Sequence, residues 1–172
     1  MGEPRWLDEG EARAWLGYRR MRALLDLQIT RDLARDSGLS DADYDVLSNL
    51  SETEDHRLRL TDLAAQMLWS SSRLSHHLTR MQTRNLVTRE GDPTDARGAV
   101  IVLTEAGWSA IRRAAPLHVQ SVRRHFMDLL SRTQIETLGV VTETVVGHLS
   151  ETSERTTVRR AGRASMPSDT HG

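Results

Sequence analysis

The arginine residues of this 172-residue chain are the first feature with clear chemical meaning. All 23 basic residues are Arg, and none is Lys. A guanidinium group is a planar fork of N–H donors that matches phosphate groups and the edge of guanine. The formal net charge is only −1, but residues 57–103 hold seven Arg and four acidic residues, whereas residues 1–56 hold seven Arg and thirteen acidic residues. The middle of the chain therefore has the charge balance of a surface that contacts nucleic acid.

The other reactive side chains form no catalytic or metal-binding pattern. The absence of Cys excludes disulfides, thiolate zinc sites and cysteine nucleophiles. His118 and His125 are seven residues apart and could hold a metal only with carboxylates from elsewhere, so exposed histidines are the simpler interpretation. Residues 75–77, Ser-His-His, lie on one expected helix and cannot fold back into a triad, and no Gly-rich phosphate loop or nucleophile elbow is present. We expect no enzyme activity, no cofactor and no metal.

Length and composition indicate one ordinary domain with an appended dimerisation arm. Hydrophobic residues make up 38% of the chain and charged residues 27%, which is typical of globular proteins. No run of eighteen apolar residues occurs, and no apolar stretch follows the first residues as a secretion signal requires. We expect a cytoplasmic, nucleoid-associated protein without a membrane partner.

The elements that position the arginines begin with two helices. Apolar residues recur at steps of three and four from Trp15 to Leu33, which predicts a long helix over about residues 8–36. Gly38 suits the C-terminal cap of this helix. Ser40 and Asp43 have the spacing of a capping box, which predicts a second helix that ends near Glu52.

The middle of the chain predicts a strand, two helices and a hairpin. Residues 57–60 alternate between polar and apolar, as in a short strand, and Thr61 is expected to cap a compact helix over residues 63–68. Three serines, residues 70–72, then begin a helix that runs to Arg84, after which Asn85 tolerates the left-handed conformation. The β-rich segments 86–90 and 99–103 flank a polar stretch, so we expect a hairpin with a long tip over residues 91–98.

Two further helices and a tail complete the expected fold. Thr104 begins a helix whose apolar positions continue from Trp108 to Leu129, and Pro116 should kink it. Ser131 and Gln134 repeat the capping-box spacing before a last helix with an apolar stripe from Ile135 to Leu149. Residues 152–172 are polar, Arg-rich and aperiodic, which predicts a disordered tail.

This order of elements is that of a winged helix-turn-helix, and the residues from Leu60 to Gly107 resemble the MarR family of transcriptional regulators. Residues 95–98, Asp-Ala-Arg-Gly, match the family's Asp-x-Arg-Gly wing signature, and residues 103–107, Leu-Thr-Glu-Ala-Gly, match the motif that follows the wing. Two positions depart from the family's pattern, Leu68 where many members carry Gly and Ser71 where many carry Pro. The resemblance implies a mainly helical fold with a small β-wing and a helical dimerisation arm.

The resemblance makes the helix over residues 70–84 the recognition helix and the hairpin the wing. In a solvated helix Arg73 and His76 would face water, but in a recognition helix they reach base edges and phosphates. In the wing, Asp95 would orient Arg97 for the minor groove. His77 and Trp69 fall where the family has apolar residues, so we expect core packing or a turn wedge for both. The candidate DNA-contacting residues are Ser70, Ser71, Ser72, Arg73, Ser75, His76, Arg80, Arg89, Asp95 and Arg97.

Outside this lobe we expect dimerisation helices and, less directly, a ligand site. The apolar stripes of the first and last helices exceed what one small winged domain can cover, which favours a homodimer. An aromatic or acidic small molecule could bind beside the DNA-binding lobe, although core packing with surface ion pairs explains the same residues equally well. The candidate ligand-binding residues are Trp15, Tyr18, Arg22, Tyr44 and Asp45.

The expected organisation is therefore an N-terminal dimerisation helix (1–38), a DNA-binding lobe (39–104), C-terminal dimerisation helices (105–151) and a tail (152–172). The resemblance implies a homodimeric regulator, most often a repressor, that binds double-stranded DNA at a palindromic operator and is released by a small ligand. The alternative is a winged-helix protein-interaction module that does not bind DNA. Salt-dependent binding to duplex DNA would distinguish the two.

Overall fold

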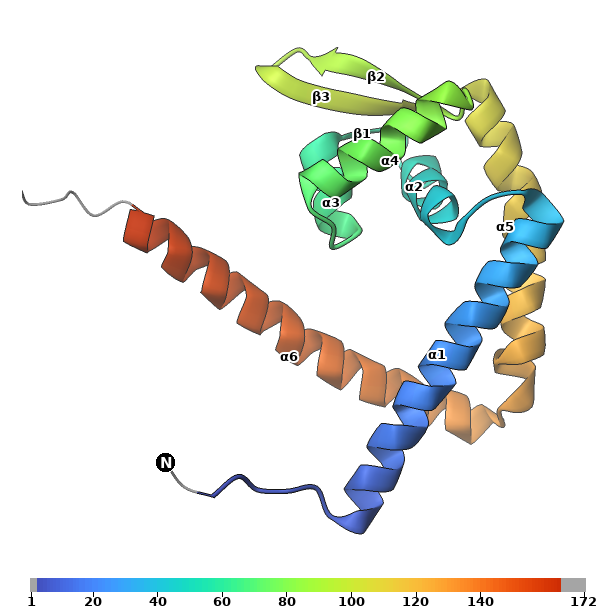
Figure 1. The fold of residues 1–172 in the computed structure, drawn as a ribbon, viewed down its shortest axis with the longest axis vertical. Coiled ribbons are helices and arrows are strands. Elements are labelled where there is room, and N and C mark those ends of the chain that lie inside the picture. Colours follow the sequence, from blue (N-terminus) through green and yellow to red (C-terminus); the bar gives the residue numbers. More distant parts are fainter. Residues whose placement is uncertain (1–2, 165–172) are drawn as a thin grey trace, which may run out of the picture. The chain divides into compact units, whose positions relative to one another are not determined.

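The computed structural model describes residues 3–164, and the side chains of residues 3–95 and 98–152 within them. It falls into two compact units, residues 1–126 and 127–172, which are described separately below (Figure 1). The first unit contains α1 (Glu9–Ser37), α2 (Asp41–Ser51), β1 (Arg57–Arg59), α3 (Leu60–Gln66), α4 (Ser71–Thr83), β2 (Val87–Asp92), β3 (Asp95–Leu103) and α5 (Glu105–His125). The second contains the 3₁₀ turn η1 (Met127–Leu129) and α6 (Arg132–Ala164). The fold is mainly helical with a small antiparallel sheet, as the sequence predicts.

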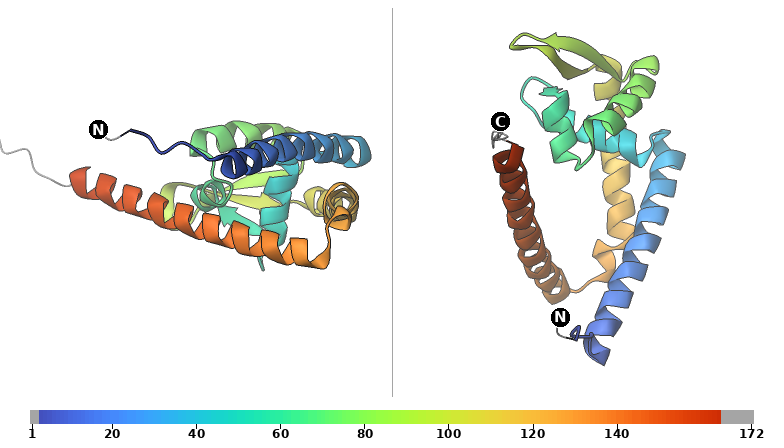
Figure 2. Two further views of the ribbon diagram at one scale, coloured as in Figure 1. Left: turned by 90° about the horizontal axis from the view of Figure 1, so that it is seen from below. Right: turned by 60° about the vertical axis from the view of Figure 1, so that its left-hand side comes forward.

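The sheet has the strand order β1-β3-β2 and carries the hairpin that projects beside α3 and α4 (Figures 1 and 2). Ile101 of the central strand pairs with Leu58 on one side and Arg89 on the other. The prediction of a long tip over residues 91–98 is wrong, because pairing extends to Asp92 and Asp95 and leaves only Pro93 and Thr94 as the turn. Asp92, at the end of β2, forms an ion pair with Arg59 of β1, a contact that local strand propensity does not reveal.

The hydrophobic core lies between α2, α3, α4 and the sheet, with contributions from the end of α1 and from α5. Its fully buried members include Leu47, Leu63, Leu78 and Ile101, one from each of four elements. The helix α4 contributes a single inward face at three- and four-residue steps, and this face leaves the opposite side of α4 exposed. The core therefore fixes which side of α4 is available to a partner.

Several helix ends follow the capping signals of the sequence. Ser40 and Asp43 form a capping box at α2, Thr104 caps α5, and Gly38 ends α1 with a left-handed φ of 69°. Asn85 closes α4 with a φ of 55°. The expectation for Thr61 is wrong, since α3 begins at Leu60 with Arg59 as its N-cap and no side-chain capping bond.

The turn between α3 and α4 has the hydrogen bonds of a Schellman motif. The Leu68 N–H donates to the Ala65 carbonyl at 3.1 Å, and the Trp69 N–H donates to the Ala64 carbonyl at 2.9 Å. This motif requires a left-handed residue, and Leu68 supplies it with a φ of 54° while its side chain is 92% exposed. The turn thus keeps the geometry for which many MarR proteins use Gly, with a leucine in a strained position.

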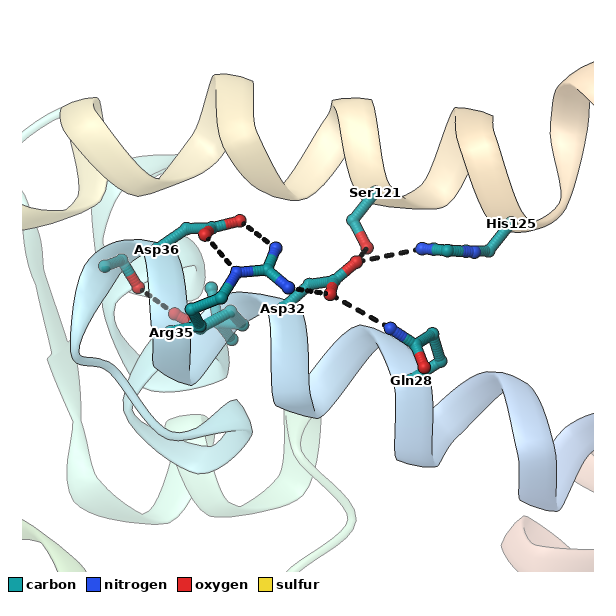
Figure 3. A network of polar contacts seen from close by, with 8 residues as sticks. Gln28, Asp32, Arg35, Asp36, Ser121 and His125 are labelled. Carbon is teal, nitrogen blue, oxygen red and sulfur yellow. Dashed lines mark hydrogen bonds and ion pairs between the residues drawn. The ribbon is translucent and has the colours of Figure 1, made fainter.

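Helix α5 packs along α1, and a polar network joins them at the buried Asp32 (Figure 3). Its carboxylate accepts hydrogen bonds from Ser121 at 2.8 Å and from Arg35 at 2.9 Å, and lies 2.9 Å from His125 Nε2. The hydrogen bond from Ser121 contributes most to holding the pKa of Asp32 at about 2, with His125 and Arg35 adding to it against the effect of burial. Asp32 is therefore a carboxylate at neutral pH and connects the two helices.

Two glycines of the family motifs allow close approach of neighbouring elements. A Cβ on Gly98 would lie 2.8 Å from the Cβ of Asp92, and a Cβ on Gly107 would lie 2.0 Å from the carbonyl oxygen of Leu86. Real Cβ atoms do not come this close to other heavy atoms. Because Gly98 has no side chain, Asp92 can pack against it in the wing. Gly107 likewise allows the start of α5 to pack against the backbone just before β2.

Helices α1 and α6 each expose apolar side chains. On α1 only Asp32 and Leu33 are buried, and the predicted apolar face nearer the N-terminus is open to solvent within one chain. In the second unit, α6 begins after Ser131, which forms the expected reciprocal hydrogen bonds with Gln134. The helix α6 runs to Ala164, whereas the sequence analysis assigned residues 152–172 to a disordered tail. Residues 165–172 lie outside the described residues.

Candidate nucleic-acid interface

The exposed face of α4 carries most of the residues expected to contact DNA. Ser70 is the N-cap and accepts a hydrogen bond from the Arg73 N–H at 3.2 Å. Ser71, Ser72, Arg73, His76 and Arg80 are exposed and Ser75 is half-buried. No acidic residue occurs in α4. This face therefore presents hydrogen-bond donors and positive charge without a carboxylate to repel phosphate.

The Arg73 side chain lies over the ring of Trp69, with Cζ 3.8 Å from the ring centroid. Trp69 is the residue directly before the N-cap of α4 and is half-buried against the core. It also meets the edge of the His77 ring, with 5.8 Å between the ring centroids. Trp69 and His77 pack as expected from the sequence, whereas the contact of Trp69 with Arg73 was not predicted.

The buried carboxylate of Asp43 on α2 holds α4 in place. It accepts a hydrogen bond from Arg84 at 2.6 Å and lies 3.1 Å from Nε2 of the buried His77. Burial alone would raise the pKa of Asp43, but hydrogen bonds from Arg84 and Ser40 outweigh it and keep the pKa below its usual value. Arg84 also donates to the Gly38 carbonyl at 3.2 Å, so the end of α1, α2 and α4 meet at one site.

His77 is neutral at this site. Arg80 lies 2.9 Å from His77 Nδ1 and, as a guanidinium, can only donate, so Nδ1 accepts and the hydrogen of the neutral ring is on Nε2. Burial, the largest influence, lowers the pKa of His77 and outweighs the attraction of Asp43. Arg80 therefore contacts the buried His77 and is itself exposed on α4.

The wing is attached to α4 and to β1 by side-chain contacts. Arg89 of β2 donates to the Ser75 hydroxyl at 3.2 Å, which links the wing to the recognition helix. On β1, Arg59 forms an ion pair with the buried Asp92 at 2.9 Å and donates to the Thr94 hydroxyl at 2.6 Å. Asp92 in turn accepts from the Thr94 N–H at 2.8 Å. Arg59 and Asp92 were not predicted as wing residues, and the only signal for them in the sequence is the Asp before Pro93 in the turn.

The two wing residues of the family signature are placed differently. Asp95 begins β3 and is exposed. The backbone of Arg97 continues β3, but its side chain lies outside the described residues. The predicted contact between Asp95 and Arg97 therefore stays a prediction.

The arginines of this region divide into two groups by their partners. Arg57, Arg59 and Arg84 form ion pairs with Glu90, Asp92 and Asp43, respectively. Within the part of the chain that the structure describes, Arg73, Arg80 and Arg89 have no carboxylate partner. Residues Ser71 and Arg89 also line a surface hollow of about 400 Å³ between α3, α4 and the wing. Of the three arginines without a carboxylate partner, Arg89 lines this hollow, which also contains the carboxylates of Asp92 and Asp95.

The candidate ligand-binding residues form two separate groups. Trp15 stacks on Tyr18 with ring centroids 5.9 Å apart, and Arg22 lies 5.9 Å over the Tyr18 ring. At a rise of 1.5 Å per residue, Trp15 lies roughly 33 Å along the helix axis from the C-terminal end of α1. Tyr44, beyond that end, contacts His118 of α5 with ring centroids 4.3 Å apart and ring planes tilted by 34°, and Asp45 beside it is exposed. A pocket shared by all five residues is not formed within one chain.

The remaining chemistry is limited. Among the described residues, no group of three or more His, Asp or Glu side chains could hold a metal ion. In the same residues no helix is long and apolar enough to span a membrane. The described residues of the interface have the groups for hydrogen bonding and charge pairing.

A helix-turn-helix followed by a two-stranded wing, with Ser, Arg and His on the exposed face of its second helix, defines a winged helix-turn-helix protein. The MarR family model matches residues 37–98. Over 86% of its length the chain is 43% identical to AbsC, a MarR family transcriptional regulator from Streptomyces coelicolor, covering 99% of that chain with a TM-score of 0.81. The chain belongs to the MarR family of transcriptional regulators, and the resemblance drawn from its sequence is confirmed.

Two further solved structures are similar to the chain, and the first of them supports the family assignment. Sco3205, a MarR family transcriptional regulator from Streptomyces coelicolor solved in complex with DNA, is 38% identical, covers 86% of this chain and 92% of its own, and has a TM-score of 0.81. BpsR from Bordetella bronchiseptica is only 19% identical over 78% of this chain and 98% of its own, and its TM-score of 0.67 shows the fold alone. No curated protein matches the chain. As a MarR-family transcriptional regulator, the protein is a non-enzymatic DNA-binding regulator.

Proposed function

We propose that this regulator is a homodimeric repressor that binds a palindromic operator, with α4 in the major groove and the wing in the adjacent minor groove. The observation that supports this proposal most directly is the exposed face of α4, on which Arg73, His76 and Arg80 are presented without a neighbouring carboxylate. The N-terminal residues of a recognition helix contact base edges, and Arg is the side chain that binds guanine with two hydrogen bonds. Arg73, in the first turn of α4, is the proposed base-reading residue.

The apolar surfaces of the outer helices support the homodimer. On α1, Leu16, Leu24 and Leu27 are 61%, 55% and 47% exposed. On α6, considered by itself, Val140 and Val146 are 64% and 60% exposed. Apolar rows of this length are unusual on a monomer and would be buried against a second copy. Two recognition helices related by a two-fold axis would read half-sites about one DNA turn apart.

Release of the operator by a small aromatic or acidic ligand completes the proposal. Trp15, Tyr18 and Arg22 form one aromatic and cationic surface, and Tyr44 with Asp45 forms another near α5. A molecule that binds differently to two arrangements of these helices shifts the equilibrium between them. A screen of phenolic and carboxylate metabolites for thermal stabilisation and operator release tests this part, and the absence of both effects would contradict it.

The DNA-binding part is tested by titrating operator and scrambled duplexes at two salt concentrations, after selection of bound sites from genomic DNA. Arg73→Ala should lower affinity by about 1–3 kcal/mol at one base pair and relax the preference there. Arg97→Ala should weaken binding to both duplexes, and Asp95→Ala should partly reproduce that effect. Arg112→Ala, an exposed arginine of α5, removes the same charge outside the proposed interface and is the matched control.

Two results would contradict the proposal. Equal losses for Arg73→Ala and Arg112→Ala on every duplex would show that α4 does not read bases. Sedimentation at micromolar concentration should give twice the monomer mass of 19.4 kDa, and a persistent monomer would exclude the palindromic operator.

A further inference from the structure

The contact between Trp69 and Arg73 joins the turn of the motif to its recognition helix. Arg73 Cζ lies 3.8 Å from the centre of the Trp69 ring, well inside the distance at which a guanidinium is attracted to an aromatic face. Trp69 lies outside α4, which begins at Ser71 after the N-cap. The ring therefore acts on Arg73 from a different element than the one that carries the arginine.

The Trp69 ring is itself fixed by several contacts. Its backbone N–H donates to the Ala64 carbonyl as part of the Schellman motif, which sets the direction of the chain at this residue. The ring also makes a T-shaped contact with His77, which is buried and lies 3.1 Å from the Asp43 carboxylate. A ring held from two sides presents one constant face to Arg73.

Stacking restrains an arginine without occupying its hydrogen-bond donors. A carboxylate partner such as Asp92 for Arg59 takes up N–H groups of the fork, whereas a ring face leaves all of the in-plane N–H groups available. Within the described residues Arg73 has no carboxylate partner that would compete with a guanine edge. The backbone at Arg73 is also restrained, because its N–H donates a hydrogen bond to the Ser70 hydroxyl.

We propose that Trp69 is a positioning residue for base recognition, which holds the Arg73 guanidinium in the orientation that binds a guanine in the major groove. This proposal rests on the proposed role of Arg73 as a base reader and adds a second determinant of specificity outside the recognition helix. Restraining a long side chain before binding reduces the entropy that it loses in the complex. The resulting gain in affinity should appear as selectivity for the base pair that Arg73 reads.

Packing of Trp69 on the core is the competing explanation and predicts a different result. If the ring only filled space, its replacement would lower stability and weaken all DNA binding equally. The two explanations separate in a double-mutant cycle of Trp69→Leu and Arg73→Ala, with Trp69→Phe as the variant that keeps an aromatic face. Trp6→Leu, an 83% exposed tryptophan ahead of α1, is the control for losing an indole elsewhere.

The experiment measures affinity for the operator and for a duplex in which the base pair that Arg73 reads is exchanged. Trp69→Leu should lose about 3- to 10-fold in affinity for the operator, much less for the exchanged duplex, and nothing further in the Arg73→Ala background. Trp69→Phe should recover part of the loss. Nitrogen-15 relaxation at Arg73 Nε in the free protein should show a more mobile side chain in Trp69→Leu than in the wild type and in Trp6→Leu.

Three outcomes would overturn the proposal. An equal loss from Trp69→Leu with and without Arg73 would make Trp69 a packing residue only. Full selectivity in Trp69→Leu, while Arg73→Ala loses it, would refute the role of Trp69 and leave Arg73 as the base reader. Unchanged selectivity in Arg73→Ala would refute both assignments. If Trp69→Leu does not fold, Trp69→Met, which also removes the aromatic face and keeps an apolar side chain, takes its place in the cycle, and the same three outcomes apply.

Discussion

Replacing Leu68 with glycine should stabilise the protein. Leu68 has a φ of 54° and a side chain that is 92% exposed, so the leucine is strained and has little packing to lose. A left-handed conformation costs roughly 1–2 kcal/mol for a residue with a Cβ, and glycine gives back about 0.5–1 kcal/mol through its greater freedom in the unfolded chain. We expect the free energy of unfolding to rise by about 0.5–1 kcal/mol.

Leu68→Ala is the matched control because it removes the same exposed side chain and keeps the Cβ. Urea denaturation of the three proteins at one fixed concentration should place Leu68→Gly above the wild type and Leu68→Ala within about 0.5 kcal/mol of it. The fixed concentration matters because the stability of a dimer depends on it. Equal stability of the glycine and alanine variants would refute the assignment of strain to this turn.

Three further predictions concern the packing and titration of the lobe. Gly107→Ala should lower the free energy of unfolding by about 3 kcal/mol in urea denaturation, because its Cβ would lie 2.0 Å from the Leu86 carbonyl oxygen, whereas Gly91→Ala, with open space, should change it little. Asp43→Ala should lower it by about 3 kcal/mol by the same assay, since Arg84 and the buried His77 lose their partner. Stability should fall between pH 6.5 and 5, because burial lowers the pKa values of His77 and His118 and the unfolded chain then binds more protons than the folded one. Urea titrations at both ends of this range should show the loss, and replacement of both histidines with Gln should reduce it.

Each of these three predictions would be contradicted by a particular result. Equal stabilities of Gly107→Ala and Gly91→Ala would contradict the close approach of α5 to β2. An Asp43→Ala protein as stable as the wild type would mean that Arg84 and His77 find other partners. A stability that rises on acidification through this range would reverse the sign expected for histidines whose folded pKa is lowered.

Sequence patterns predicted the elements whose signals are local. The three- and four-residue periodicity of α1 and the capping residues Ser40 and Thr104 act within one turn of helix, so their positions in the chain determine the structure directly. The identity of α4 as the second motif helix followed from the same kind of signal, together with the family motifs around the wing.

Long-range contacts account for what the sequence did not reveal. Asp43 was predicted only as part of a capping box, although its carboxylate also accepts a hydrogen bond from Arg84, which is 41 residues away in the sequence. The wing strands extend because Asp92 meets Arg59 of β1, a contact that hairpin propensity does not encode. Trp69 and Arg73 are four residues apart, yet their stacking depends on the left-handed turn at Leu68, where the sequence departs from the family.

The close packing of other residues against Gly98 and Gly107 affects how the operator preference of one MarR protein can be inferred from that of another. At both glycines the space of a side chain is occupied by other atoms of the same chain. The two glycines are therefore required for folding and carry no information about which DNA is bound. Two MarR proteins that share these glycines can therefore share a scaffold and recognise unrelated operators. Homology inferred from the wing motif should be used to transfer the fold, and operator preference should be compared through the exposed residues of α4 and the turn before it.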